Sequence, residues 1–210
     1  MAEVYVLREG DLIIDGFDSV TAPASVTLVV YEGNNDTKYL LVDAGSIWDT
    51  PEALDNWLSD SPYDITHQDI YAAIITHNHP DHTGLIRYLG GDTGATIYGS
   101  DSSYHNRKPH IFNTDKLFSA KDITIIQTPG HETSHDQSVL VNTPEGIVAI
   151  VGDLMLNEKE FTDIADFSQW PPEHNTYASD SRSTIKTIED LYKVIPGHGP
   201  AFDPRDMINI

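Results

Sequence analysis

Thr76-His77-Asn78-His79-Pro80-Asp81-His82 is the stretch of this sequence that decides its fold and its chemistry. It places three imidazoles and one carboxylate close together, directly after the apolar run 70–75. A single histidine is usually an ordinary core or surface residue, whereas three histidines with an aspartate at the spacing H-x-H-x-D-H are typical of metal ligands. We therefore predict a metal site at the end of a buried strand.

Three further candidate ligands follow predicted strands, and each stands beside a glycine. His131 follows a Pro-Gly pair, Asp153 follows a Val-Gly pair, and His198 lies between two glycines. Loops at strand ends are where rigid scaffolds present functional groups, and glycine lets the backbone approach closely. Alone, each residue is equally well explained as a turn residue or a cap. Together with the first motif, the three favour one shared metal site.

The rest of the chain reads as short strands in two halves, with helices between them. Strands are predicted at 12–14, 25–31, 39–42, 70–75, 95–98, 123–127, 138–141, 147–151 and 194–195. Helices are predicted from Thr50-Pro51 onward, at 83–89, and at 180–193 with Ile185, Ile188, Leu191 and Tyr192 on one face. No stretch reads as a linker, so we expect residues 1–210 to form a single domain of two packed sheets with helices outside.

The order of these motifs resembles that of the metallo-β-lactamase superfamily, starting with Asp43-Ala44-Gly45 and ending at His198. The resemblance implies an α/β fold, a four-layer αββα sandwich, with two metal ions along one edge of the β layers. It also implies a role for each matched position: His77, His79 and His131 bind one metal, Asp81, His82 and His198 bind the second, Asp153 bridges the two, and Asp43 steadies the histidine loop.

Imidazole and carboxylate ligands without thiolate suit Zn²⁺, and they also suit Fe or Mn. We expect two divalent ions, with Zn²⁺ favoured. Two metals about 3.5–4 Å apart lower the pKa of a shared water, so a metal-bridging hydroxide is expected to attack an ester, amide, thioester or phosphodiester bond. Asp81 is expected to be catalytic as well as a ligand, because it can orient the hydroxide.

Within the superfamily, the sequence is similar to the group of metallo-β-lactamase domain-containing protein 1 and its archaeal and bacterial relatives. The similarity rests on Asp136-Gln137-Ser138-Val139 after His131, on the segment 149–153, and on the ending 194–200. It makes nuclease and β-lactamase activities the candidate reactions, although one scaffold serves many substrates.

Two other interpretations stay open. The first is a mononuclear Fe persulfide dioxygenase-like oxidoreductase that uses His77, His79 and His131. The oxygen-reducing branch normally has Glu at the position of His79, so the histidine favours hydrolysis. The second is a non-catalytic binding protein that keeps metal for stability, which predicts a closed coordination sphere.

Four residues are candidate substrate contacts outside the metal set: Phe17, Arg107, Lys108 and His174. Phe17 lies where the superfamily often carries a substrate-covering loop. Arg107 and Lys108 belong to the basic island 105–110 and are candidates to anchor an anion, whereas a solvated loop is the alternative. His174 follows the bridging aspartate, where a loop histidine without function is the alternative. The three tryptophans are expected to pack in the core or at the rim.

Charge is the most unusual feature of the composition: 33 acidic against 12 basic residues give a formal net charge of −21. Such a surface suits a salt-rich cytoplasm, because molar salt screens charges beyond about 3 Å. A halophilic protein is therefore one hypothesis, and an ordinary acidic protein is the other.

The composition also limits chemistry and location. Cysteine is absent, which excludes disulfides, thiolate ligands and a cysteine nucleophile. No apolar run approaches bilayer length, and the first residues lack the pattern of a signal peptide. We expect a cytoplasmic monomer or homodimer with a small-molecule or nucleic-acid substrate and no membrane partner.

Overall fold

The structure is a computed structural model that describes residues 1–15, 19–34, 36–99, 102–105, 108–111, 118, 120–132, 135–162 and 172–207. The expectations for Phe17 and Arg107 lie outside these ranges. The side chains of Lys108 and His174 also lie outside what the structure describes.

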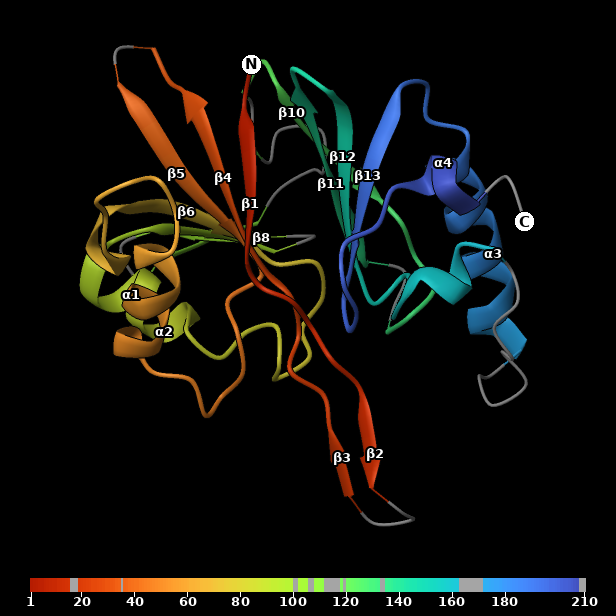
Figure 1. Cartoon of the computed structure of the whole chain (residues 1–210). Coiled ribbons are helices and arrows are strands. Elements are labelled where there is room, and N and C mark those ends of the chain that lie inside the picture. The colour runs from red at the N-terminus through yellow and green to blue at the C-terminus, as the bar shows by residue number, and fades with distance from the viewer. Residues whose placement is uncertain are drawn as a thin grey trace.

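Two β-sheets pack face to face at the centre of the molecule, and helices cover both outer faces (Figure 1). In spatial order, the larger sheet consists of β1 (Glu3–Arg8), β4 (Val26–Glu32), β5 (Thr37–Val42), β6 (Ile70–Ile74), β7 (Thr96–Tyr98), β8 (Ser102–His105) and β9 (Lys108–Ile111). The smaller sheet consists of β10 (Ile123–Gln127), β11 (Gln137–Thr143), β12 (Gly146–Gly152) and β13 (Leu191–Pro196). A separate hairpin of β2 (Ile13–Asp15) and β3 (Ser19–Thr21) projects from the sandwich.

Helices α1 (Pro51–Ser59) and α2 (Ile86–Tyr88) lie beside the larger sheet, and α3 (Pro172–Lys186) and α4 (Pro204–Met207) lie beside the smaller one. The predicted α/β fold, a four-layer αββα sandwich, is therefore confirmed. The described residues also form three short helical turns: η1 (His67–Asp69), η2 (Leu89–Thr93) and η4 (Glu158–Glu160). Within the described ranges, no helix is both long enough and apolar enough to cross a bilayer.

The hydrophobic core lies in three layers that follow this architecture. Val29, Leu40 and Ile74 of the larger sheet pack between the sheets against Val139 and Ile150 of the smaller one. Two further clusters fill the space between each sheet and its helices. Strands β4 and β6 are buried on both faces, which explains why they read as continuous apolar runs rather than as alternating patterns.

Local signals predicted helix α1 well. Thr50 accepts a hydrogen bond from the Ala53 N–H at 3.3 Å, and Pro51 occupies the first helical position. Proline is favoured there because its missing N–H has no partner in the first turn and its φ suits a helix.

The predicted helix at 180–193 was wrong at both ends. Helix α3 spans Pro172–Lys186, and Leu191 and Tyr192 belong to strand β13 instead. Asp190 turns the chain with a φ of 58°, and β13 then pairs in parallel with β12. The apolar positions near this junction fit a helical period, but the pairing with β12 decides their structure. The predicted helix at 83–89 is also shorter in the structure. Helix α2 spans Ile86–Tyr88, and the π-helical turn η2 follows it.

Five strands deliver the predicted site residues to one region of the molecule. Asp43 follows β5, His77 follows β6, His131 follows β10, Asp153 follows β12, and His198 follows β13. The parallel pairs β5–β6 and β12–β13 bring their carboxyl ends to the same edge of each sheet. The candidate ligands therefore meet where the two sheets face each other.

Candidate metal centre

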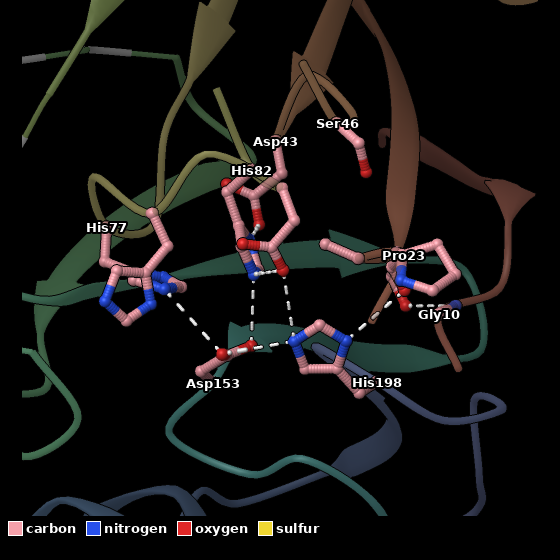
Figure 2. Close-up of polar contacts among 12 residues, drawn as sticks. Gly10, Pro23, Asp43, Ser46, His77, His82, Asp153 and His198 are labelled. Atoms are coloured by element: carbon pink, nitrogen blue, oxygen red, sulfur yellow. Dashed lines mark hydrogen bonds and ion pairs between the residues drawn. The ribbon is translucent and has the colours of Figure 1, made fainter. Parts of the chain in front are cut away.

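All seven predicted ligands come together in two adjoining sets. The ligand atoms of the first set lie within 4.8 Å of one another, and so do those of the second; the sets are His77, His79, His131 and Asp153, and Asp81, His82 and His198. Figure 2 shows His77, His82 and His198 arranged around Asp153.

Asp153 lies between the two sets. Its Oδ2 is 3.2 Å from His131 Nε2 and 3.2 Å from His198 Nε2. Its Oδ1 is 3.1 Å from His82 Nε2. One carboxylate thus contacts imidazoles of both sets, which is the geometry that a bridging ligand needs.

The residues present fit a divalent cation. His77 is 5% exposed, and its buried Nε2 makes no hydrogen bond to any residue that the structure describes. A buried polar nitrogen without such a bond costs about 1–3 kcal/mol. A cation would satisfy this nitrogen, and the set of nitrogen and carboxylate donors without sulfur suits Zn²⁺, Fe or Mn.

The electrostatics of the first set favour metal binding. Burial, assisted by the neighbouring His82, lowers the pKa of His77 to about 2. Burial also lowers the pKa of His131. Burial alone would raise the pKa of Asp153, but His82 and His198 outweigh it and hold this pKa well below its usual range. Neutral imidazoles beside an ionised carboxylate are the protonation states that metal ligands require.

Asp43 orients the histidine loop. Its Oδ1 accepts a hydrogen bond from the Thr76 N–H at 2.8 Å, and its Oδ2 accepts one from the Thr76 hydroxyl at 2.9 Å. The same Oδ2 lies 2.7 Å from His82 Nδ1. Burial opposes the charged form of His82, but Asp43 and Asp153 outweigh it and raise this pKa well above its ordinary value. The contact at Nδ1 turns Nε2 of the ring toward Asp153.

Asp136 performs a similar role for the loop of His131, and sequence reasoning missed it. Its Oδ2 accepts backbone hydrogen bonds from Gly130 at 3.3 Å, His131 at 2.8 Å and Glu132 at 2.9 Å. An aspartate a few residues after a Pro-Gly turn is a recognisable acceptor for such N–H groups. The sequence therefore contains a local signal for this role of Asp136.

Helix α3 holds the loop of His131 from the other side. The Ser181 hydroxyl donates to the Pro129 carbonyl at 2.7 Å. Gly130 packs directly on the helix, because a Cβ at this position would lie 2.5 Å from the Ala178 Cα. This close approach requires glycine, and the φ of 146° at Gly130 also favours it.

The next residue of α3 holds the loop of Asp153. Arg182 is buried, and its Nε donates to the Leu154 carbonyl at 2.7 Å. Its guanidinium also lies 3.4 Å from Glu160 Oε2, which accepts the Leu156 N–H at 2.7 Å. The Leu156 carbonyl in turn accepts from the His198 N–H at 2.9 Å. One face of α3 therefore supports three of the ligand loops.

The base of the β2–β3 hairpin positions the ring of His198. Its Nδ1 lies 3.3 Å from the carbonyl oxygens of Asp11 and Pro23. The Ser25 hydroxyl donates to the Pro196 carbonyl at 2.7 Å and accepts from the Gly10 N–H at 2.9 Å. Gly10 and Pro23 appear beside His198 in Figure 2.

The candidate substrate contacts have no observed side-chain environment. Phe17 and Arg107 lie outside the described residues; of Lys108 and His174, the structure describes only the backbone, in β9 and α3. Their roles stay predictions. Trp57 packs beneath the guanidinium of Arg8, 4.6 Å from the ring centroid, as expected for a packing residue.

Comparison with known proteins gives a family match. The model of the metallo-beta-lactamase superfamily matches residues 21–198. The uncharacterized protein C03F11.2 of Caenorhabditis elegans is 30% identical over 187 residues, which cover 85% of this chain and 48% of that protein. Human metallo-beta-lactamase domain-containing protein 1 is 29% identical over 167 residues, which cover 78% of this chain and 59% of that protein. The chain thus spans about half to three fifths of the length of these relatives.

Solved structures share the fold at low sequence identity. A metallo-beta-lactamase family protein of Thermus thermophilus matches with a TM-score of 0.64 and 18% identity, over 97% of this chain and 76% of that one. A mutant of B. thuringiensis AiiA with N-decanoyl-L-homoserine at its active site matches with a TM-score of 0.63 and 17% identity. The match covers 93% of this chain and 92% of that one. By the family match and the shared fold, this chain belongs to the metallo-beta-lactamase superfamily.

Proposed function

We propose that this protein is a hydrolase that uses two divalent metal ions, with Zn²⁺ favoured. Superfamily membership and the His/Asp cluster support a metal-dependent, hydrolase-like function in general. The observation that carries the finer proposal is the position of Asp153, which contacts imidazoles of both sets. We take residues 1–210 as one domain, because the central core layer draws on both sheets.

In this proposal His77, His79 and His131 hold the first ion, and Asp81, His82 and His198 hold the second, with Asp153 between them. Bound ions would supply Lewis acidity and lower the pKa of a water molecule. Asp81 is the more accessible carboxylate of the cluster: its side chain is 24% exposed, against 4% for Asp153. It is therefore placed to meet an entering substrate and to accept a proton at Oδ2, 3.3 Å from His198 Nε2.

The chemistry supports cleavage of an ester, lactone, amide, thioester or phosphodiester bond. The chain contains no cysteine, and no covalent nucleophile is needed when metal ions activate water. Acyl compounds gain some support from the ligand of one structural relative, N-decanoyl-L-homoserine. The name of the human relative does not specify a substrate.

The decisive test is metal content together with a hydrolysis screen. We expect about two divalent ions per chain, loss of turnover on chelation, and recovery when Zn²⁺ is returned. Asp81→Ala should abolish turnover more completely than His174→Ala. One Fe per chain would instead favour the mononuclear oxygenase, and a protein with two ions that cleaves none of these bonds would contradict the hydrolase proposal.

A further inference from the structure

We propose that a pocket beside Asp81, walled by Trp48, binds an uncharged apolar substituent of the substrate next to the scissile bond. This inference rests on the proposed hydrolase function and narrows its substrate to compounds that carry such a substituent beside the scissile bond.

The pocket adjoins the candidate metal centre at Asp81. It has a volume of about 520 Å³, and its lining includes Pro23, Ile47, Trp48, Pro80 and Asp81. Pockets for small ligands range over about 300–1,000 Å³, so it is large enough for an acyl chain or an aromatic ring. A larger pocket of about 650 Å³ beside β11 and β12 touches none of the seven cluster residues.

Large apolar side chains are exposed at this pocket. Trp48 is 81% exposed and Ile47 is 55% exposed, although tryptophan usually covers much of its surface by packing. Trp48 is thus neither a core residue nor well packed at the rim, which differs from the expectation for the three tryptophans. A ligand surface that covers these two side chains would remove apolar area from water.

The turn that carries Trp48 is held firmly. The Asp49 carboxylate accepts the Ser46 N–H at 2.6 Å, and the Asp49 N–H donates to the Ser46 carbonyl at 2.9 Å. Gly84 packs against this turn so closely that a Cβ there would lie 1.9 Å from the Ser46 carbonyl oxygen. The backbone that carries Trp48 is therefore held in place, and a backbone that is already ordered lowers the entropy cost of binding.

The charges of the pocket disfavour an anionic ligand. Among the described residues that line the pocket, the cation is Arg8. The Nη1 of Arg8 already forms an ion pair with Asp49 at 2.7 Å. The Nε and Nη2 of Arg8 both donate to the Ala24 carbonyl, at 3.0 and 2.8 Å. Asp81 adds a carboxylate to the lining, and the chain carries a net charge of −21. The described lining residues thus offer no uncommitted cation to an anionic substituent, whereas a neutral apolar group would fit.

The test compares p-nitrophenyl acetate, butyrate and octanoate, using zinc-loaded protein. We expect kcat/KM to rise with acyl length. Trp48→Ala should lower kcat/KM for octanoate by about 10-fold or more, chiefly through KM, and change that for acetate little. The control is Tyr71→Ala, because Tyr71 is 44% exposed at the start of β6 and should not affect any substrate.

Binding of N-octylacetamide, an uncharged probe that is not an ester, gives a second readout by calorimetry. Trp48→Ala should weaken it about 10-fold, and this result would support the pocket even if the protein cleaved no ester and the hydrolase proposal failed. Unchanged chain-length dependence in an active Trp48→Ala variant would overturn the pocket and leave the hydrolase proposal intact. A change from dimer to monomer in Trp48→Ala by sedimentation would also overturn it, by showing that Trp48 lies in an interface between two copies of the chain.

Discussion

At the scale of single residues, the candidate centre depends on buried polar groups that are not themselves ligand candidates. Asp43, Asp136 and Glu160 each use a carboxylate to hold backbone N–H groups of a ligand loop. Buried polar groups that lose a partner cost more than exposed ones, because water cannot replace that partner. The ligand positions are therefore sensitive to residues that no metal-binding motif contains.

Asp136→Ala should disorder the loop of His131, because three backbone N–H groups lose their acceptor. We expect zinc affinity to fall about 10- to 100-fold, as for other residues that orient metal ligands. Competition with a fluorescent chelator measures this affinity. The exposed Asp92→Ala is the matched control and should bind zinc like the wild type.

Glu160→Gln should change how stability depends on pH. Burial raises the pKa of Glu160, with Arg182 opposing. A carboxyl whose pKa is higher in the folded state than its unfolded value of about 4.3 stabilises the protein at pH values below about 4.3. This stabilisation is lost as the pH rises through the folded-state pKa. We therefore expect urea unfolding of metal-free protein, measured from about pH 4 to about pH 7, to show a free energy of unfolding that increases with pH in the variant relative to the wild type. If the free energies of unfolding of the variant and the wild type changed equally with pH, this interpretation would be contradicted.

At the scale of elements, α3 supports the centre although it supplies no predicted metal ligand. Its consecutive residues Ser181 and Arg182 bond the loops that carry His131 and Asp153. The hairpin base does the same for His198 through Ser25. Ligand geometry is thus set jointly by elements that lie far apart in the sequence.

Arg182→Met should destabilise the protein by about 3–5 kcal/mol in urea unfolding, because it leaves the buried Glu160 unpaired. The double variant Arg182→Met with Glu160→Leu should recover much of that loss, since apolar side chains can replace a buried ion pair. Zinc affinity should stay low in both, because the Leu154 carbonyl has lost the Nε donor.

Full recovery of zinc affinity in the double variant would show that the ion pair serves stability alone. The control is Ser183→Ala on the exposed face of α3, where the hydroxyl donates to the helix's own Ser179 carbonyl. It should leave zinc affinity unchanged.

At the scale of the whole molecule, net charge governs behaviour that no single contact explains. With a formal charge of −21, the folded chain repels itself more than the unfolded chain does, because folding brings the charges closer. Salt reduces this repulsion, since the Debye length falls from about 10 Å at 0.1 M to about 3 Å at 1 M.

The urea midpoint of unfolding should therefore rise between 0.1 M and 1 M KCl, values that span this change of about threefold in screening length. A variant with lysine at the exposed positions Glu145, Glu158 and Glu189 should show a weaker rise. A midpoint that does not move would argue for an ordinary acidic protein and against adaptation to salt.

The sequence by itself determined the parts of this protein that depend on neighbours along the chain. The spacing H-x-H-x-D-H and the glycines beside His131, Asp153 and His198 identified all seven members of the cluster, and apolar runs located most core strands. Helix α1 was readable because its cap and first residue lie side by side in the chain.

Only the tertiary structure decided the features that depend on distant partners. Leu191 entered a strand because β12 pairs with it, and Arg182 became part of the centre because α3 packs on the loop of Asp153. Trp48 is exposed beside Asp81 because the turn 46–49 is held against Gly84. Periodicity and motif spacing are local quantities, so they cannot report which surfaces meet when the chain folds.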